Sequence, residues 1–215
     1  MDGSLRQNLK MSKTVVLYVI AGLLIAPAAA YAGSAFEFSS ASHDSSNGSW
    51  VFGVDFTVGS SDLLVSSLGY FDDNGDGFLS DHEVGIYDAG GNLLASTDVT
   101  NSDPLTGHFR FDAITPLTLL AGNSYIVVGV NGSDHYTYVD PGFVTDPDII
   151  YHGAEYGNGN TLFDPSASHN NFNDGFWGPN FQVGVASASP EPATFSFMGM
   201  GLTVLFAVLR RGRTI

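Results

Sequence analysis

The sequence predicts an all-β fold, a jelly-roll-like β-sandwich formed by residues 33–188, with a targeting segment at each end of the chain. Short segments rich in β-branched and aromatic residues recur along this stretch, and turn-forming residues separate them about every 8–12 residues. No helical period of useful length occurs between the terminal segments. Because the 215-residue chain has no cysteine, core packing must hold the domain together, with a metal ion as the one further aid.

Residues 1–32 are predicted to be a secretory signal peptide. Three basic residues precede the apolar stretch 14–25, and Ala30 and Ala32 form a small-x-small cleavage site. This order is typical of a leader that the Sec translocon exports and that is then removed, so the mature chain would begin at Gly33. The alternative is an uncleaved N-terminal anchor.

Eight segments are candidate strands of the sandwich. The first two, Trp50–Val58 and Leu63–Phe71, are separated by a Gly-Ser-Ser-Asp turn. The others, in chain order, are Glu83–Tyr87, Leu93–Val99, His108–Ala113, Ser124–Val130, Tyr136–Val139 and Phe181–Ala186.

Residues 141–180 differ in composition, because Gly, Asn, Pro, Asp and His dominate among scattered aromatic residues. The stretch is too long for an ordinary connection, so we expect a functional loop or an irregular excursion packed by its own rings. Aromatic rings stack on sugar faces, although the same rings could simply pack the loop. The candidate glycan-binding residues are Tyr151, Tyr156, Phe172, Phe176 and Trp177.

Residues 72–83 have the spacing of the twelve-residue calcium loop, in which hard oxygen ligands wrap around one ion and a glycine, here Gly77, permits a sharp turn. The expected ligands are the side chains of Asp72, Asn74, Asp76 and Glu83 and the carbonyl of Phe78. Strand-like segments flank the loop where helices flank an EF-hand. Two interpretations therefore stay open, a weak calcium site or a strand-to-strand loop with ordinary turn residues.

Charge restricts the partners of the predicted domain. Between Gly33 and Ser189 lie 20 acidic residues and one basic residue, Arg110, a net charge of about −19. Such a surface repels nucleic acid, keeps an exported domain soluble and attracts divalent cations.

No nucleophile, phosphate-loop or metalloprotease motif occurs, so we expect no enzyme. The hydrolase alternative would use an acidic pair such as Asp146 and Asp148.

The C-terminal segment, residues 189–215, has three parts in order. A Pro-Glu-Pro sequence precedes an uncharged apolar run, residues 193–209, and an arginine cluster follows. As a helix the run would extend about 25 Å, enough for a thin bilayer, and the arginines would stay on the cytoplasmic side. The residues of the two polar parts are Pro190, Glu191, Pro192, Arg210, Arg211 and Arg213.

This layout resembles the PEP-CTERM sorting signal over about residues 189–213. The resemblance implies cleavage by an exosortase, a membrane-embedded enzyme that acts near the Pro-Glu-Pro, in a bacterium that makes exopolysaccharide or biofilm matrix. The chain is then expected to cross the inner membrane, to be anchored there transiently and to reach the cell surface or the extracellular matrix. A plain tail anchor is the alternative.

A second likeness rests on the order of strands and turns in residues 51–58, 68–72, 75–77, 82–88, 91–96 and 117–125. Over Trp50–Asn131 this order resembles a family of β-sandwich domains of unknown function in bacterial surface proteins, which offers no catalytic residues to transfer. The sequence thus predicts an exported surface or matrix protein with a structural or interaction role, possible partners being exosortase and exopolysaccharide. The alternative is a calcium-assisted carbohydrate-binding module.

Overall fold

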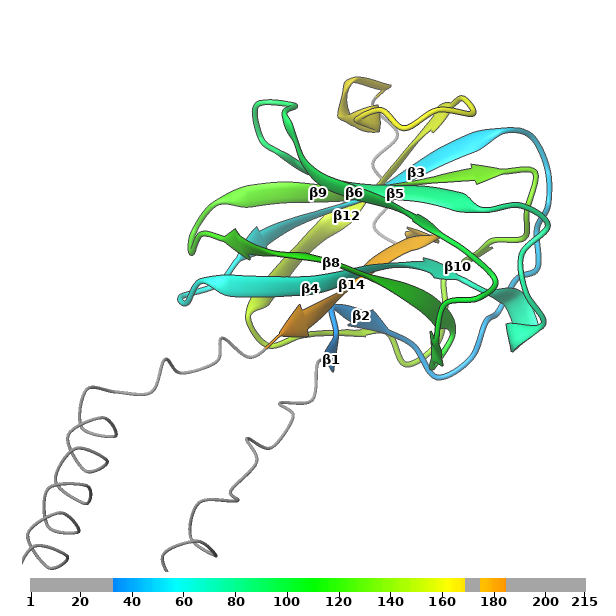
Figure 1. Ribbon diagram of the computed structural model, residues 1–215, viewed down its shortest axis with the longest axis horizontal. Helices are drawn as coiled ribbons and strands as arrows, with labels where there is room; N and C mark the ends of the chain where they lie inside the picture. The colour runs from blue at the N-terminus through cyan, green and yellow to red at the C-terminus, as the bar shows by residue number, and fades with distance from the viewer. Residues whose placement is uncertain (1–32, 169–174, 185–215) are drawn as a thin grey trace, which may run out of the picture. The chain divides into compact units, whose positions relative to one another are not determined.

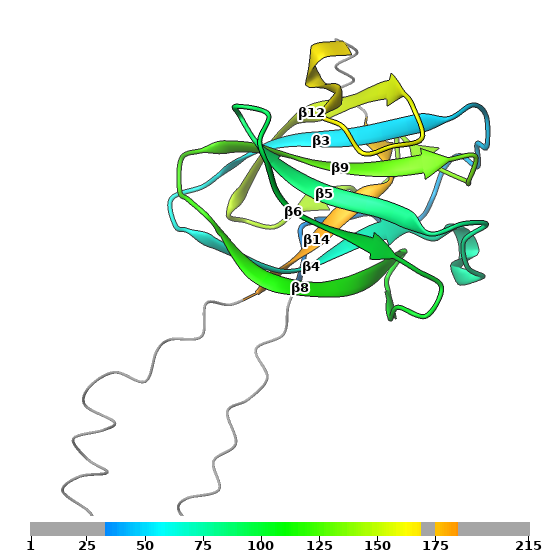
Figure 2. The same cartoon turned by 45° about the horizontal axis from the view of Figure 1, so that its top comes forward.

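The computed structural model describes residues 33–168 and 175–184. The fold is all-β and consistent with the predicted sandwich, because two five-stranded antiparallel sheets lie one over the other (Figures 1 and 2). Sheet 1 has the order β1 (Gly33–Ser34), β14 (Pro179–Gly184), β4 (Leu63–Phe71), β8 (Phe109–Leu119) and β7 (Leu105–Thr106). Sheet 2 has the order β12 (Ile149–Asn158), β3 (Trp50–Val58), β9 (Ser124–Gly132), β5 (His82–Asp88) and β6 (Leu93–Val99).

The remaining described elements are short. Strand β10 (Thr137–Tyr138) pairs with β13 (Phe176–Trp177), and β2 (Phe36–Glu37) pairs with β11 (Val144–Thr145). Two 3-10 turns, η1 (Asp73–Gly75) and η2 (Pro165–Ser168), interrupt the connections.

The main core lies between the two sheets, because alternate side chains of the long strands point inward. Val54 and Phe56 of β3 are fully buried, as are Leu68 of β4 and Phe181 of β14. The Phe36 ring lies 5.8 Å from that of Phe181, so the start of the domain is packed into the same core. Because the chain has no cysteine, no disulfide stabilises the fold, and core packing must do so. Each fully buried apolar side chain contributes about 1.5–3 kcal/mol to stability.

Several predicted strand boundaries are confirmed. Strands β3, β4 and β6 have the predicted bounds, and β5 and β9 extend the predicted segments by one or two residues. Strand β10 is shorter than predicted, and β14 begins two residues before Phe181. Residues 185 and 186 lie outside the described part of the chain.

Strand β8 continues to Leu119, although the predicted strand ended at Ala113. The register against β4 passes from Val65↔Leu117 to Ser67↔Ala113, so residues 114–116 form a bulge. Pro116 lies in this bulge, where its missing N–H removes no ladder hydrogen bond. The prediction stopped too early because the proline interrupts the strand pattern without interrupting the strand.

Strand β12 corrects the prediction for residues 141–180. Its ten residues pair along β3 and complete sheet 2, so this part of the stretch is regular. The strand was missed because its glycines and polar residues do not alternate with apolar ones.

The predicted signal peptide, with Ala30 and Ala32, and the predicted sorting tail, residues 189–215, lie outside the described residues. Within the described ranges, no helix has the length and apolar character that crossing a membrane requires. Strand β1 pairs with the end of β14, with Gly33 opposite Val183, so the described domain begins and ends at the same place (Figure 1).

Candidate functional site

Loops from both sheets meet at one end of the domain, which we call the loop end. The register places the first residue of β3, Trp50, opposite Gly132 at the end of β9, and Tyr70 near the end of β4 opposite Pro179 at the start of β14. The Tyr70 hydroxyl donates a hydrogen bond to Asn131 Oδ1 at 2.9 Å, which joins the two sheets here. Connections at this end include residues 38–49, 72–81, 100–104 and 133–136.

The calcium-like loop connects β4 to β5 at the loop end, and strands flank it as expected. Its predicted ligands do not converge. In the described part of the chain, the one group of three His, Asp or Glu side chains with ligand atoms within 4.8 Å of one another is Asp44, Asp73 and His135. Glu83 lies in β5 beside His82, which is buried, so successive side chains place the Glu83 carboxylate on the opposite face of sheet 2.

The arrangement differs from a calcium loop because other groups already satisfy the expected ligands. Asp72 is 1% exposed, and its Oδ2 accepts a hydrogen bond from Arg110 Nε at 2.6 Å while its Oδ1 accepts one from the Gly77 N–H at 3.0 Å. The carbonyl of Phe78 accepts a hydrogen bond from Asn101 Nδ2 at 3.0 Å. In this conformation the five predicted ligands do not meet at one point, and a guanidinium balances the charge of Asp72, so the calcium loop stays a prediction.

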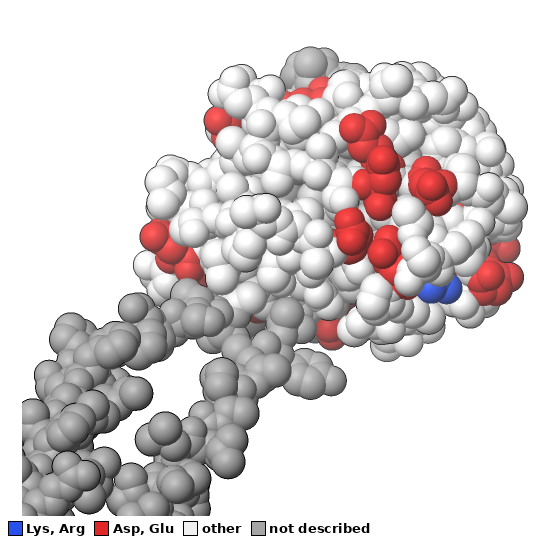
Figure 3. All heavy atoms as spheres, viewed as in Figure 1, with Lys and Arg blue, Asp and Glu red and all other residues white. Residues whose placement is uncertain are grey.

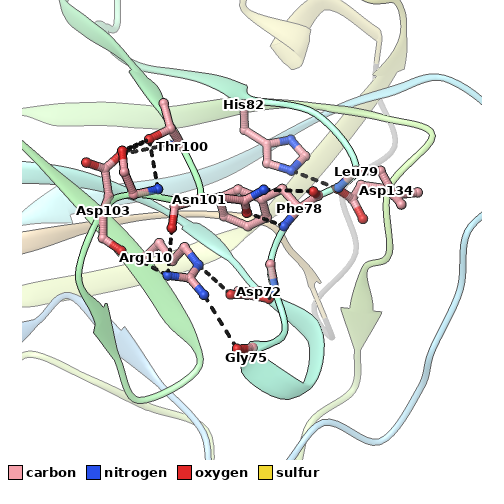
Figure 4. Close-up of polar contacts among 12 residues, drawn as sticks. Asp72, Gly75, Phe78, Leu79, His82, Thr100, Asn101, Asp103, Arg110 and Asp134 are labelled. Carbon is pink, nitrogen blue, oxygen red and sulfur yellow. Dashed lines mark hydrogen bonds and ion pairs between the residues drawn. The ribbon is translucent and has the colours of Figure 1, made fainter.

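Arg110 holds two loops together at this point (Figure 4). Besides Asp72, its guanidinium donates to the carbonyl oxygens of Asn101 at 3.2 Å, Asp103 at 3.0 Å and Gly75 at 3.4 Å. The planar fork of donors suits several acceptors at once. The loop after β4 and the loop after β6 are thus tied to one side chain.

A second polar cluster supports the same loop. Asp134 Oδ2 accepts hydrogen bonds from the Leu79 N–H at 2.7 Å and from His82 Nε2 at 3.2 Å (Figure 4). Burial alone would raise the pKa of Asp134, but the hydrogen bonds from His82, the His135 N–H and the Leu79 N–H outweigh it and lower that pKa. The His82 ring stacks on Tyr70 with centroids 4.0 Å apart. This part of the loop end is therefore built on the core.

An acidic hollow of about 460 Å³ lies over this cluster. His135 Nδ1 hydrogen-bonds to Asp44 and lies 3.9 Å from Asp73 Oδ2. The Asp44 hydrogen bond, opposed by burial, raises the pKa of His135, and burial together with the Asp44 charge raises the pKa of Asp73. The carboxylate oxygens of Asp44 and Asp73 are ligands of the kind that a hard cation takes. The hollow is lined by Asp44, Asp73, Asn74, Asp76, Gly77, Phe78, Leu79, Asp134 and His135.

The acidic hollow keeps two predicted side-chain ligands, Asn74 and Asp76, and adds four titratable groups that sequence reasoning missed, Asp44, Asp73, Asp134 and His135. Asp44 and His135 are 91 residues apart, and no local spacing connects them. Figure 3 shows several acidic side chains on the same side of the face in view as the one basic group visible there. The four carboxylates that line the hollow, Asp44, Asp73, Asp76 and Asp134, give a cation favourable charge.

An aromatic hollow of about 390 Å³ lies beside the acidic one. Tyr138 and Phe176 are paired across the β10–β13 ribbon, and their ring centroids lie 5.8 Å apart. Phe176 lies flat on the buried Phe52, with centroids 5.1 Å apart and planes 9° apart. The hollow is lined by Ser45, Asn47, Tyr136, Tyr138, Val139, Gly175 and Phe176.

Polar groups at the edge of the aromatic hollow are held in place. Asn47 Oδ1 accepts hydrogen bonds from the Tyr136 hydroxyl at 2.9 Å and from Trp50 Nε1 at 3.1 Å. Val139, which is 50% exposed, has φ 56°, a left-handed conformation that a β-branched residue rarely adopts. Such strain is concentrated at ligand-binding sites, because the surrounding structure must enforce it.

The predicted glycan-binding residues do not form one exposed platform. Trp177 is 2% exposed, and the partly buried Tyr151 packs against the main core. Alternation in the two-residue strand β13 sends Trp177 inward and Phe176 outward. Tyr156 packs edge-on against Phe176 at 5.1 Å, and Phe172 lies outside the described residues.

The acidic pair proposed for a hydrolase forms a turn. Asp146 Oδ1 accepts a hydrogen bond from the Asp148 N–H at 2.9 Å, so these residues cap a local bend.

No protein-family model matches the chain, and no curated protein matches it either. The functional argument therefore rests on the two hollows of the loop end.

Proposed function

We propose that this chain is an exported cell-surface or matrix protein, sorted through a PEP-CTERM tail, whose jelly-roll-like domain binds polysaccharide and catalyses no reaction. The observation that carries the binding proposal is the aromatic hollow at the loop end. Half-buried rings beside hydroxyl and amide groups form the usual composition of a small-ligand site. Sugar rings present flat C–H faces and hydroxyl edges, which suit such a mixture.

The acidic hollow supports a calcium-assisted form of this binding. Asp44 and His135 adjoin Ser45 and Tyr136 in the chain, so the two hollows share a border. An anionic polysaccharide would be repelled by a domain of this charge unless a cation neutralised part of it. Calcium, which accepts carboxylate and hydroxyl oxygens together, would supply that neutralisation.

The position of the chain ends is compatible with tethering. Strand β14 begins at the loop end with Pro179 and ends at Gly184, at the opposite end of the sheet. Its residue Val183 pairs with Gly33 there. A domain held through residues that follow Gly184 would therefore direct the loop end away from its attachment. This arrangement suits a surface protein that contacts matrix.

Removal of either ring from the hollow should weaken polysaccharide binding. We expect Tyr138→Ala and Phe176→Ala each to lower affinity about tenfold, because a central aromatic contact typically contributes more than 1 kcal/mol. The measurement is binding of the full chain, purified in detergent, to a glycan array and to exopolysaccharide of the exporting bacterium. The control is Leu120→Ala, an exposed apolar residue at the opposite end of the domain. Equal affinity of wild type and both ring variants would contradict the site.

The sorting proposal has its own test. In the exporting bacterium we expect a mature N-terminus at Gly33 and loss of the C-terminal segment near Pro190–Pro192, both measured by mass spectrometry. Deleting the exosortase should leave a heavier form in the membrane fraction, and replacing Glu191 with alanine should do the same in the wild-type strain. Unchanged mass and location in the deletion strain would identify a simple anchor instead.

A further inference from the structure

Two carboxylates lie side by side on the outer face of sheet 2, away from the loop-end hollows. Asp55 of β3 stands opposite Gly153 of β12, and Glu155 of β12 stands opposite Gly53 of β3. The two acids are thus diagonal neighbours on one face. Because each faces a glycine, no other side chain of these strands separates them.

Residues 159–168, which we call the covering segment, lie over strands β12 and β3 (Figure 2). Leu162 and Phe163 of this segment pack against a second apolar cluster on the same face. A Cβ added to Gly53 would lie 3.0 Å from Pro165 Cγ, so the segment comes down close to the sheet. Glu155 is accordingly 8% exposed.

The buried carboxyl of Glu155 lacks a conventional partner. Its Oε2 is shielded from solvent and meets no hydrogen-bond donor among the described residues. The group that it faces is the carboxyl of Asp55, within hydrogen-bonding reach. Two carboxylates in this contact need either a shared proton or a cation between them. Their closeness also excludes a glycosidase pair, whose carboxyls stand about 5 Å or more apart.

The charged neighbours that act on Asp55 in the described part of the chain are both acidic. Burial first, then the hydrogen bond and charge of Glu155 and the charge of Asp164, raise the pKa of Asp55 to about 7. Tyr87 of β5 lies on the same face, and its pKa is raised by burial and by the charges of Glu83 and Asp164. His152 of β12 is bonded to the Thr57 hydroxyl at 2.7 Å.

We propose that Asp55 and Glu155, beneath the covering segment, form a binding site for a divalent hard cation, Ca²⁺. Two carboxylates offer up to four oxygens, and Ca²⁺ accepts six to eight in flexible geometry, with water completing the set. The ion would join strand β3 to the edge strand β12.

The test is thermal unfolding of the full chain in detergent at pH 8, in chelator and in 10 mM CaCl₂. For a weak extracellular-type site, we expect Ca²⁺ to raise the Tm by ~3–10 °C. Asp55→Asn and Glu155→Gln should each abolish this rise. Both replacements remove a repelling charge without removing volume, so the variants should be at least as stable as wild type in chelator.

The matched control is Asp73→Asn, which removes a carboxylate from the acidic hollow and should keep most of the rise. Binding stoichiometry from calorimetry with CaCl₂ provides a second measurement, with one site lost in Asp55→Asn. No rise in wild type, or a rise that persists in both Asp55→Asn and Glu155→Gln, would overturn the proposal. A rise lost only in Asp73→Asn would assign the ion to the loop end instead.

Discussion

Replacing Arg110 with alanine is expected to destabilise the domain by about 3–5 kcal/mol, the cost of leaving a buried partner charge without compensation. Asp72 keeps its carboxylate fully buried in the ion pair, and the Arg110 side chain is 15% exposed. The same change removes hydrogen bonds to three carbonyl oxygens in two loops. Urea unfolding followed by tryptophan fluorescence would measure the loss.

Two further variants separate charge from geometry in this prediction. Asp72→Asn introduced with Arg110→Ala should restore part of the stability, because no buried charge then remains unpaired. Arg110→Lys should be less stable than wild type and more stable than Arg110→Ala. A single ammonium keeps a positive charge beside Asp72 but cannot reach the carboxylate and three carbonyls together. A cost below about 1 kcal/mol for Arg110→Ala would mean that the pair behaves as an exposed salt bridge.

The largest pH effect is expected at Asp55. Its pKa is raised from 3.8 to about 7 in the folded protein, so between these values the folded state binds a proton that the unfolded state has lost. The stability that this proton contributes is fully present below about pH 4 and is lost as the pH rises through about 7. A shift of this size would correspond to ~4 kcal/mol for a fully buried group, and we expect ~1–2 kcal/mol after solvent screening of this partly exposed one.

Asp55→Asn should therefore stabilise the domain by ~1–2 kcal/mol at pH 8 and change little at pH 4.5. The measurement is urea unfolding of both proteins at several pH values in chelator, so that no cation replaces the proton. Asp98→Asn, an exposed acid of β6, serves as the control and should leave the pH profile almost unchanged. Parallel profiles for wild type and Asp55→Asn would show that the carboxyl pair is ionised throughout.

The strands with clear turn boundaries could be predicted from local composition. Trp50–Val58, Leu63–Phe71 and Leu93–Val99 are bounded by Gly, Ser, Asn and Asp, and their bounds agree with the structure. Strand β12 could not be predicted in this way. Its residues 153–155 are buried without a break, and Ile150 is an apolar residue that is 53% exposed, so apolar and polar residues do not alternate along it.

The candidate sites likewise combine features that local sequence predicts with features that only tertiary contacts decide. The spacing of Asp72, Asn74 and Asp76 is a local property, but Arg110, 38 residues beyond Asp72, decides which of these oxygens remains for an ion. Likewise, Phe176 and Trp177 are neighbouring aromatic residues that the sequence does not distinguish as binding candidates. Pairing with β10 decides which ring faces outward.

By itself, the sequence determined the β-rich pattern, the main turns, the acidity of the domain and the two segments expected to direct export and sorting. These are properties of neighbouring residues and of composition. Only the tertiary structure decided that Asp44 meets His135, that Tyr138 meets Phe176 and that Asp55 meets Glu155. Each of these pairs is brought together by strand register or loop packing across tens of residues, and a one-residue change in register would separate them.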